Sequence, residues 1–138
     1  VQGSGTALRM TAANFISEFR NSLPLQEELY RFTFAKLSQA RQTAACNCFH
    51  AVDARLARWL LMTSDRMRSD QFLLTQAFLA DMLGVRRAAV SAASSDLQRR
   101  HLISYSRGTI GIIDRKGVKA LSCECYETMK SMHRSIPL

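Results

Sequence analysis

Apolar residues recur at helical spacing on both sides of Gly84, in a stretch that organises the chain. Ala80 would allow two helices to approach closely, Gly84 would supply a left-handed turn, and Val90 would pack the second helix onto the first. The pattern predicts a helix-turn-helix in residues 76–95, although many buried helix pairs share it. Its apolar positions are Phe78, Leu79, Met82, Leu83, Val90, Ala93 and Leu97.

Residues 1–24 contain one predicted helix. Residues 1–10 resemble the end of a strand, and Thr11 is a candidate N-cap for a helix over residues 11–19. Residues 21–24 break that helix, and Pro24 suits the first turn of the next one.

The next predicted helix, residues 25–46, is apolar on more than one face. One stripe contains Leu25, Leu29 and Phe32, and another contains Tyr30, Phe34 and Leu37. A helix with one wet side needs only one stripe. We therefore expect a dimerisation helix, the alternative being a helix buried at the centre of a monomer.

Further elements flank the helix-turn-helix. Residues 52–64 predict an amphipathic helix with Trp59 in the core, residues 65–71 a loop, and Thr75 the N-cap of the next helix. Two β-rich runs around Arg107 and Gly108 predict a hairpin with a basic tip over residues 103–114. Residues 115–132 predict one closing helix, with a frayed tail from residue 129. The predicted fold is mainly α with a small β hairpin, a winged helix.

Positive charge is concentrated in one part of the chain. The 138 residues carry a net charge of +8, of which residues 86–119 hold eight basic and two acidic side chains, or +6. This asymmetry favours an anionic partner, with nucleic acid ahead of acidic lipid or protein. No apolar run approaches the ~20 residues of a membrane span. The start of the sequence resembles neither a signal peptide nor an initiator, so we expect a piece of a longer protein.

The cysteines invite a zinc interpretation that their spacing disfavours. Cys46 and Cys48 are two residues apart, as are Cys123 and Cys125, and residues two apart on a helix point about 200° apart. Zinc cysteines are usually two to four residues apart, and convergence here would need irregular backbone. Reduced thiols are therefore the favoured prediction, with a metal site or redox switch as the alternative. No catalytic arrangement of Cys, His and Asp is recognisable, so no enzyme is predicted.

Several motifs, in order, closely resemble the Crp/Fnr superfamily of bacterial transcription regulators, in the branch described as cyclic-nucleotide-binding-type regulators. They are RLARWLLM at residues 55–62, LTQ at 74–76, MLGVRR at 82–87 and YSRG at 105–108, with ACN at 45–47 and CECY at 123–126. The resemblance implies a sensor remnant in residues 1–22, a dimerisation helix in 23–50 and a winged helix-turn-helix domain in 51–138. The cyclic-nucleotide phosphate cassette and the iron–sulfur cysteine cluster of the family are absent from this sequence. No cofactor is therefore expected in this fragment, and the effector is unknown.

The resemblance also implies a DNA site. Helix 86–100 would read the major groove, with Arg87 pairing with guanine, while the 103–114 wing would contact the backbone. Ala88 departs from the family's glutamate or proline, so the family's operator does not transfer. The expected DNA-binding residues are Thr75, Gln76, Arg86, Arg87, Ala88, Ser91, Ser95, Arg99, Arg107, Gly108 and Thr109. Of Arg99 and Arg100, one should face DNA or solvent and the other pair with Asp96.

The sequence thus predicts a cytoplasmic bacterial transcription regulator. It would act as a homodimer through residues 25–46 on near-palindromic double-stranded DNA, with RNA polymerase as a further candidate partner. The alternative function is a winged-helix module whose basic face binds an acidic protein.

Overall fold

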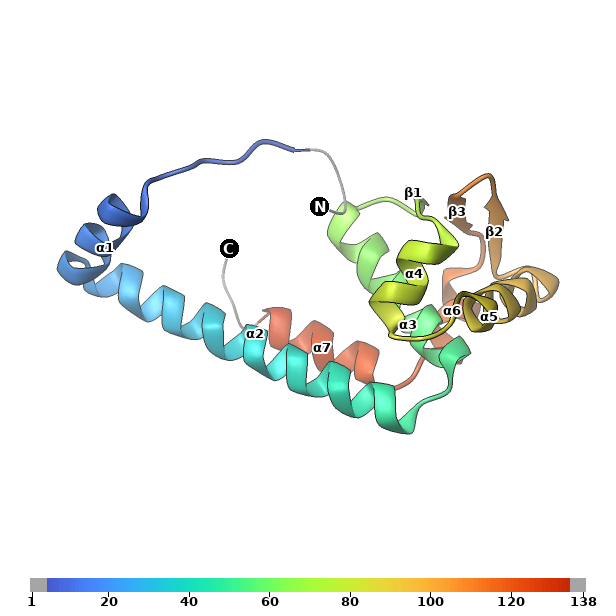
Figure 1. Ribbon diagram of the computed structural model, residues 1–138. Coiled ribbons are helices and arrows are strands. Elements are labelled where there is room, and N and C mark those ends of the chain that lie inside the picture. Colours follow the sequence, from blue (N-terminus) through green and yellow to red (C-terminus); the bar gives the residue numbers. More distant parts are fainter. Residues whose placement is uncertain (1–4, 135–138) are drawn as a thin grey trace.

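The computed structural model describes residues 5–134 (Figure 1). The longest helix in this part of the chain has 27 residues. The predicted fold class, mainly α with a small β element, is confirmed. None of the described helices is long and apolar enough to cross a membrane. The elements are α1 (Ala12–Asn21), α2 (Leu23–Phe49), α3 (Val52–Met67), β1 (Gln71–Leu73), α4 (Gln76–Leu83), α5 (Arg87–Arg99), β2 (Ile103–Ser106), β3 (Thr109–Ile112), α6 (Arg115–Leu121) and α7 (Cys125–Arg134).

Helix α1 folds back on the start of α2. The Thr11 hydroxyl accepts a hydrogen bond from the Asn14 amide at 3.2 Å, which confirms the predicted N-cap. The Phe19 and Tyr30 rings meet edge to face with centroids 6.1 Å apart. The predicted strand at the start is wrong for residues 5–10, which are exposed and form no strand because no other strand lies beside them to pair with; residues 1–4 lie outside the described part.

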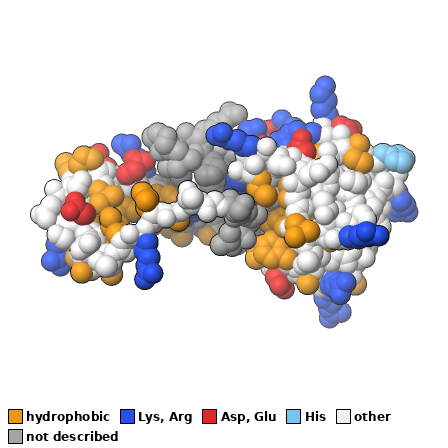
Figure 2. All heavy atoms as spheres, turned by 90° about the horizontal axis from the view of Figure 1, so that it is seen from above, with side chains coloured by type: hydrophobic (Ala, Val, Ile, Leu, Met, Phe, Trp, Pro, Cys, Tyr) orange, Lys and Arg blue, Asp and Glu red, His pale blue; other side chains and the backbone are white. Residues whose placement is uncertain are grey.

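The two apolar stripes of α2 have different environments. In the first stripe Leu25 and Leu29 are half-buried and Phe32 is 47% exposed, whereas in the second stripe Tyr30, Phe34 and Leu37 are 64%, 73% and 57% exposed. Helix α7 lies along the C-terminal half of α2 (Figure 1) and contributes to burying Cys46. Figure 2 shows hydrophobic side chains open to solvent on the arm that α1 and α2 form. One side of α2 therefore has partners in its own chain, and the other side has an uncovered apolar stripe.

Helix α3 lies at the centre of the globular part. It packs against both α5 and α6, and Leu56, Leu60 and Leu61 are completely buried. Trp59 is 9% exposed, and its ring meets the edge of Phe78 at 6.1 Å between centroids. The prediction of Trp59 as a core residue is confirmed.

The sheet has a third strand that the sequence did not predict. Strands β2 and β3 form the expected hairpin, and β1 pairs antiparallel with the free edge of β3, giving the order β1-β3-β2. Phe72 of β1 lies opposite Ile110 of β3, and both are buried. Three residues are too few to show an alternating pattern, so only this distant pairing reveals β1.

The closing helix is two helices, not one. The chain leaves the helical conformation at Ser122 (φ −69°, ψ 151°), and α7 restarts at Cys125. Met129 is 1% exposed, so the prediction of a frayed tail from residue 129 is wrong through residue 134, because α7 packs against α2 and α3. Residues 135–138 lie outside the described part.

Candidate nucleic-acid interface

The turn between α4 and α5 has the geometry that the sequence predicts. The Thr75 hydroxyl accepts from the Phe78 amide at 3.2 Å, and α4 ends at Gly84 with a left-handed φ of +63°. Ala80 and Val90 are buried where the two helices meet. The three residues that define the predicted turn therefore have their predicted structural positions.

Helix α5 presents one face to the core and one to solvent. Val90, Ala93 and Leu97 are buried, as predicted. The predicted groove-facing residues Arg87, Ala88 and Ser95 are exposed, and Ser91 is half-buried. On this exposed side of α5, Arg87 is therefore surrounded by small side chains.

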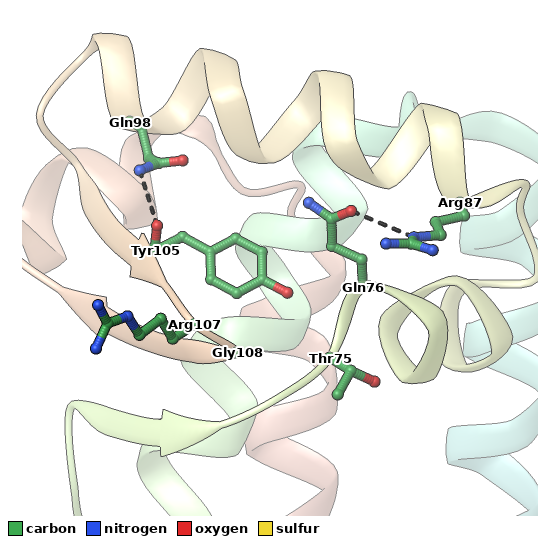
Figure 3. A pocket seen from close by; sticks show the side chains of 7 residues that line it. All are labelled: Thr75, Gln76, Arg87, Gln98, Tyr105, Arg107 and Gly108. Carbon is green, nitrogen blue, oxygen red and sulfur yellow. Dashed lines mark hydrogen bonds between the residues drawn. The ribbon is translucent and has the colours of Figure 1, made fainter.

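The solvent side of α5 and the hairpin enclose a shallow groove of about 480 Å³ (Figure 3). Five predicted residues line it: Thr75, Gln76, Arg87, Arg107 and Gly108. The Arg87 Nε donates to the Gln76 Oε1 at 3.5 Å, so the starts of α4 and α5 are in contact. This bond is long, and it leaves the two terminal nitrogens of the guanidinium without a protein partner among the described residues.

Two groove residues, Gln98 and Tyr105, were not predicted as site residues. Gln98 Nε2 donates to the Tyr105 carbonyl at 3.3 Å and so joins α5 to the hairpin. Gln98 lies eleven positions after Arg87, which is close to three whole helical turns. Extending the predicted groove face by one more turn would have identified Gln98, whereas nothing local identifies Tyr105. The other predicted residues, which do not line the groove, are Arg86, Ala88, Ser91, Ser95, Arg99 and Thr109.

The hairpin tip holds a basic residue in an unfavourable backbone conformation. Arg107 and Gly108 have φ values of +49° and +80°, as a two-residue type I′ hairpin loop requires. A residue with a Cβ loses roughly 1–2 kcal/mol in the left-handed region. Arg107 therefore holds a backbone conformation that glycine or asparagine favours, as Arg68 and His101 also do.

Tyr105 and Leu74 hold the hairpin against the start of α4. The Tyr105 hydroxyl donates to the Leu74 carbonyl at 3.0 Å, and the Leu74 amide donates to the Gly108 carbonyl at 2.6 Å. Burial raises the pKa of the Tyr105 hydroxyl, and the positive charge of Arg87 partly opposes this shift. Leu74 directly precedes the Thr75 cap, so the tip and the helix-turn-helix share one backbone junction.

The first turn of α5 has no side-chain cap. Arg86 occupies the N-cap position and makes no capping hydrogen bond. The first amides of a helix have no partner within it, and the helix dipole makes this end favourable for anions. The start of α5 therefore offers backbone donors beside two exposed arginines, Arg86 and Arg87.

Half of the basic side chains in residues 86–119 are neutralised within the protein. Asp96 pairs with both Arg99 and Arg100 at 2.8 Å, because one carboxylate lies within reach of the residues three and four positions later. The prediction that only one of these arginines pairs is therefore wrong. Arg115 pairs with Asp65 and Asp70, and Lys119 pairs with Glu127. Within this described stretch, the cations without an ion pair are Arg86, Arg87, Arg107 and Lys116.

Residues 54–121 match the family model of the Crp-like helix-turn-helix domain. A search among functionally curated proteins found no significant sequence match. The fold is similar to that of a Crp/Fnr-family transcriptional regulator from Thermus thermophilus (TM-score 0.69, 23% identity, 73% of this chain and 55% of that chain). FixK2 from Bradyrhizobium japonicum (0.67, 17%, 80% and 58%) and a Crp/Fnr-family protein from Eubacterium rectale (0.63, 22%, 76% and 49%) are also similar. The chain therefore spans about half the length of these proteins.

Replacing Tyr105 with Phe removes the hydroxyl that donates to Leu74. We expect the Tyr105→Phe variant to unfold with a free energy lower by about 0.5–1.5 kcal/mol in urea titrations near neutral pH. Tyr30→Phe is the control, because the Tyr30 side chain is exposed and makes no hydrogen bond among the described residues.

The difference in stability between wild type and Tyr105→Phe should also depend on pH. The folded-state pKa of Tyr105 is raised, so its stabilising contribution is complete below the unfolded-state pKa of about 10 and is lost as pH rises through the folded-state value. The stability difference between wild type and Tyr105→Phe should therefore shrink above roughly pH 10. A constant difference at all pH values would contradict the role of the neutral hydroxyl.

Proposed function

Since residues 54–121 match the family model of the Crp-like helix-turn-helix domain, we propose that this chain is a sequence-specific DNA-binding part of a transcription regulator. One observation carries the proposal. The uncapped start of α5, with its free arginines, opens into the same groove as the basic hairpin tip. Backbone amides, guanidinium groups and a helix dipole directed at one place suit the phosphates and base edges of a duplex.

Arg87 is the residue that we assign to base reading. Its terminal nitrogens are free to form the two-bond contact with guanine O6 and N7 in the major groove. Exposed Ala88 is too short to hydrogen-bond a base, and its methyl suits a thymine methyl group. Ser91 and Ser95 continue this face of α5 and would supply single hydroxyl contacts.

The remaining contacts go to phosphates, which position the protein without reading sequence. Thr75, Gln76 and Arg86 lie around the start of the two helices, and Arg107, Gly108 and Thr109 form the hairpin tip. Arg99 is 77% exposed but paired with Asp96, so a phosphate would have to compete with that carboxylate. Its contribution is accordingly the smallest of the set.

The exposed stripe of α2, formed by Tyr30, Phe34 and Leu37, suits a second copy of the same chain. In a two-fold symmetric pair, the stripe would cover its own counterpart. Two symmetric readers then require a near-palindromic site with half-sites about one helical turn apart. Contact with RNA polymerase would use surfaces away from the groove.

Arg87→Ala should reduce specificity. On a duplex selected from a random pool with the wild-type chain, we expect a loss of about 1–3 kcal/mol in binding free energy, and a much smaller loss on random DNA. Fluorescence anisotropy titrations measure both. Lys116→Ala is the matched control, since this free cation lies outside the groove lining. Equal losses on the two duplexes would refute a base-reading role.

Arg107→Asn should weaken binding to every duplex equally. Asparagine tolerates the left-handed backbone at this position, so the change removes the charge and keeps the turn. The plot of log affinity against log salt should become less steep by about one unit. An unchanged slope would exclude a phosphate contact at the tip. Absence of any salt-sensitive DNA binding by the wild-type chain would favour a protein-binding module instead.

Phe34→Glu should dissociate the proposed dimer. The variant places a charge in the centre of the exposed stripe, where the apolar surface of the second copy would otherwise cover it. Sedimentation velocity should show a shift from dimer to monomer. Lys36→Glu is the control, because it introduces a negative charge at an exposed position about 100° or more around α2 from each residue of the stripe, and it should leave the dimer intact. A wild-type chain that is monomeric at all concentrations would exclude this interface.

A further inference from the structure

Four potential metal ligands meet where α2 ends and α7 begins. They are Cys46, His50, Cys123 and Cys125, and their ligand atoms all lie within 4.8 Å of one another. The three cysteines are buried, and His50 is half-buried. This cluster lies outside the groove lined by α5 and the hairpin.

The helix break after α6 makes the cluster possible. Cys46 and His50 are four residues apart at the end of α2, so they lie on one face of the helix. Cys123 falls in the non-helical link and Cys125 begins α7, so the 200° separation expected on a continuous helix does not apply. Cys48 is exposed on α2 and does not belong to the cluster. The sequence pattern paired Cys46 with Cys48, whereas the fold pairs Cys46 with His50.

The separations match a tetrahedral metal centre. Zn–S bonds of about 2.3 Å place neighbouring sulfurs about 3.8 Å apart at the corners of a tetrahedron. The Cys46 and Cys123 sulfurs are 3.5 Å apart, and the Cys125 sulfur is 3.7 Å from the His50 Nδ1. The Cys46–Cys123 separation exceeds the S–S bond length of about 2.05 Å, and all four cysteines are free thiols.

Outer partners orient two of the four ligands. The His50 Nε2 lies 3.1 Å from a Glu124 carboxylate oxygen, which leaves Nδ1 directed at the sulfurs. A carboxylate on the far nitrogen of a metal-binding histidine fixes its tautomer and raises its basicity. Gln42 Nε2 donates to the Cys125 sulfur at 3.1 Å, as a donor to a bound thiolate would. The cluster therefore has both inner ligands and the surrounding hydrogen bonds of a metal site.

A buried cation supplies an independent indication. The Arg58 side chain is in the core at 3% exposure, has no ion pair among the described residues, and leaves its Nε without a hydrogen bond. The Arg58 guanidinium contacts the Met129 sulfur on α7, the helix that begins with the ligand Cys125. A buried charge is costly unless an opposite charge lies nearby. Zinc held by three thiolates and one neutral imidazole carries one net negative charge, which would balance Arg58.

We propose that Cys46, His50 through Nδ1, Cys123 and Cys125 bind one structural Zn²⁺ ion. With all four positions taken by protein atoms, the centre is closed and has no open position for catalysis. It fastens the end of α2 to the link between α6 and α7, directly before the chain turns at residues 50–51 into α3. The ion therefore fixes the angle between the long helix and the globular part. The zinc proposal does not depend on DNA binding, because the test measures the bound metal directly.

Metal analysis of the chain, expressed with zinc and purified without a histidine tag, tests this proposal. We expect one zinc per chain in the wild type and in Cys48→Ser, and a loss of zinc in Cys46→Ser, Cys123→Ser and Cys125→Ser. Co²⁺ added to the reduced, metal-free wild type should give the visible and thiolate charge-transfer absorption of a tetrahedral centre. Removing zinc with a chelator should lower the melting temperature of the wild type and of Cys48→Ser.

Two further variants distinguish the loss of a zinc ligand from misfolding of the cysteine variants. His50→Ala removes a half-exposed ligand and should lose zinc while retaining the wild-type circular dichroism spectrum. Glu124→Gln keeps every ligand and should lower zinc affinity about 10–100-fold. A reduced wild-type chain that binds neither zinc nor Co²⁺ overturns the proposal. Equal zinc loss in Cys48→Ser would also overturn it.

Discussion

The burial of α3 is the constraint on which the rest of the structure depends. This helix is enclosed by α5, α6 and α7, and Leu56 and Leu60 are completely removed from solvent. Each such leucine contributes about 1.5–3 kcal/mol of hydrophobic stabilisation. Enclosure on several sides also buries Arg55 and Arg58, whose charges must find compensation inside the protein. Arg55 finds it at the Leu83 carbonyl, at the end of α4, whereas Arg58 contacts sulfur atoms of Met62 and Met129.

The same burial determines where the groove lies. With Val90 and Leu97 held against α3 and α4, the opposite face of α5 is free, and Arg87 emerges beside Gln76 (Figure 3). The hairpin reaches this groove because Leu74 binds it from both its amide and its carbonyl. Arg99 and Arg100 are both paired with Asp96. Fewer unpaired cations therefore contribute to the positive potential of the groove than the composition indicates. Figure 2 accordingly shows Lys and Arg side chains around the globular part rather than in one block.

Local rules predicted much of this arrangement. A cap at Thr75, a left-handed Gly84 and the spacing of Val90, Ala93 and Leu97 each depend on a few neighbouring residues, and each is confirmed. Features that depend on distant partners could not be predicted in the same way. Strand β1 exists because it pairs with β3, whose register partners lie 36–40 residues later. The four-ligand cluster joins the end of α2 to a link more than 70 residues further on, and its helix break is invisible to a periodicity argument. The sequence spacing pairs Cys46 with Cys48, whereas the fold brings Cys46 together with His50, Cys123 and Cys125.

Helix α2 connects the proposed dimer interface with the proposed zinc site. Its 27 residues extend about 40 Å, and a continuous helix of this length transmits an angular change at one end to the other. The exposed Phe34 and Leu37 lie away from the side that faces α7, where Ala35 and Cys46 are buried. One helix can therefore pair with a second copy while its far end is fastened to the globular part. In a symmetric dimer, the separation of two grooves depends on the angle at residues 50–51 in both copies. A metal ion that fixes this angle would thus influence the half-site spacing as well as the stability of the junction, because the cluster lies where the chain turns from α2 into α3.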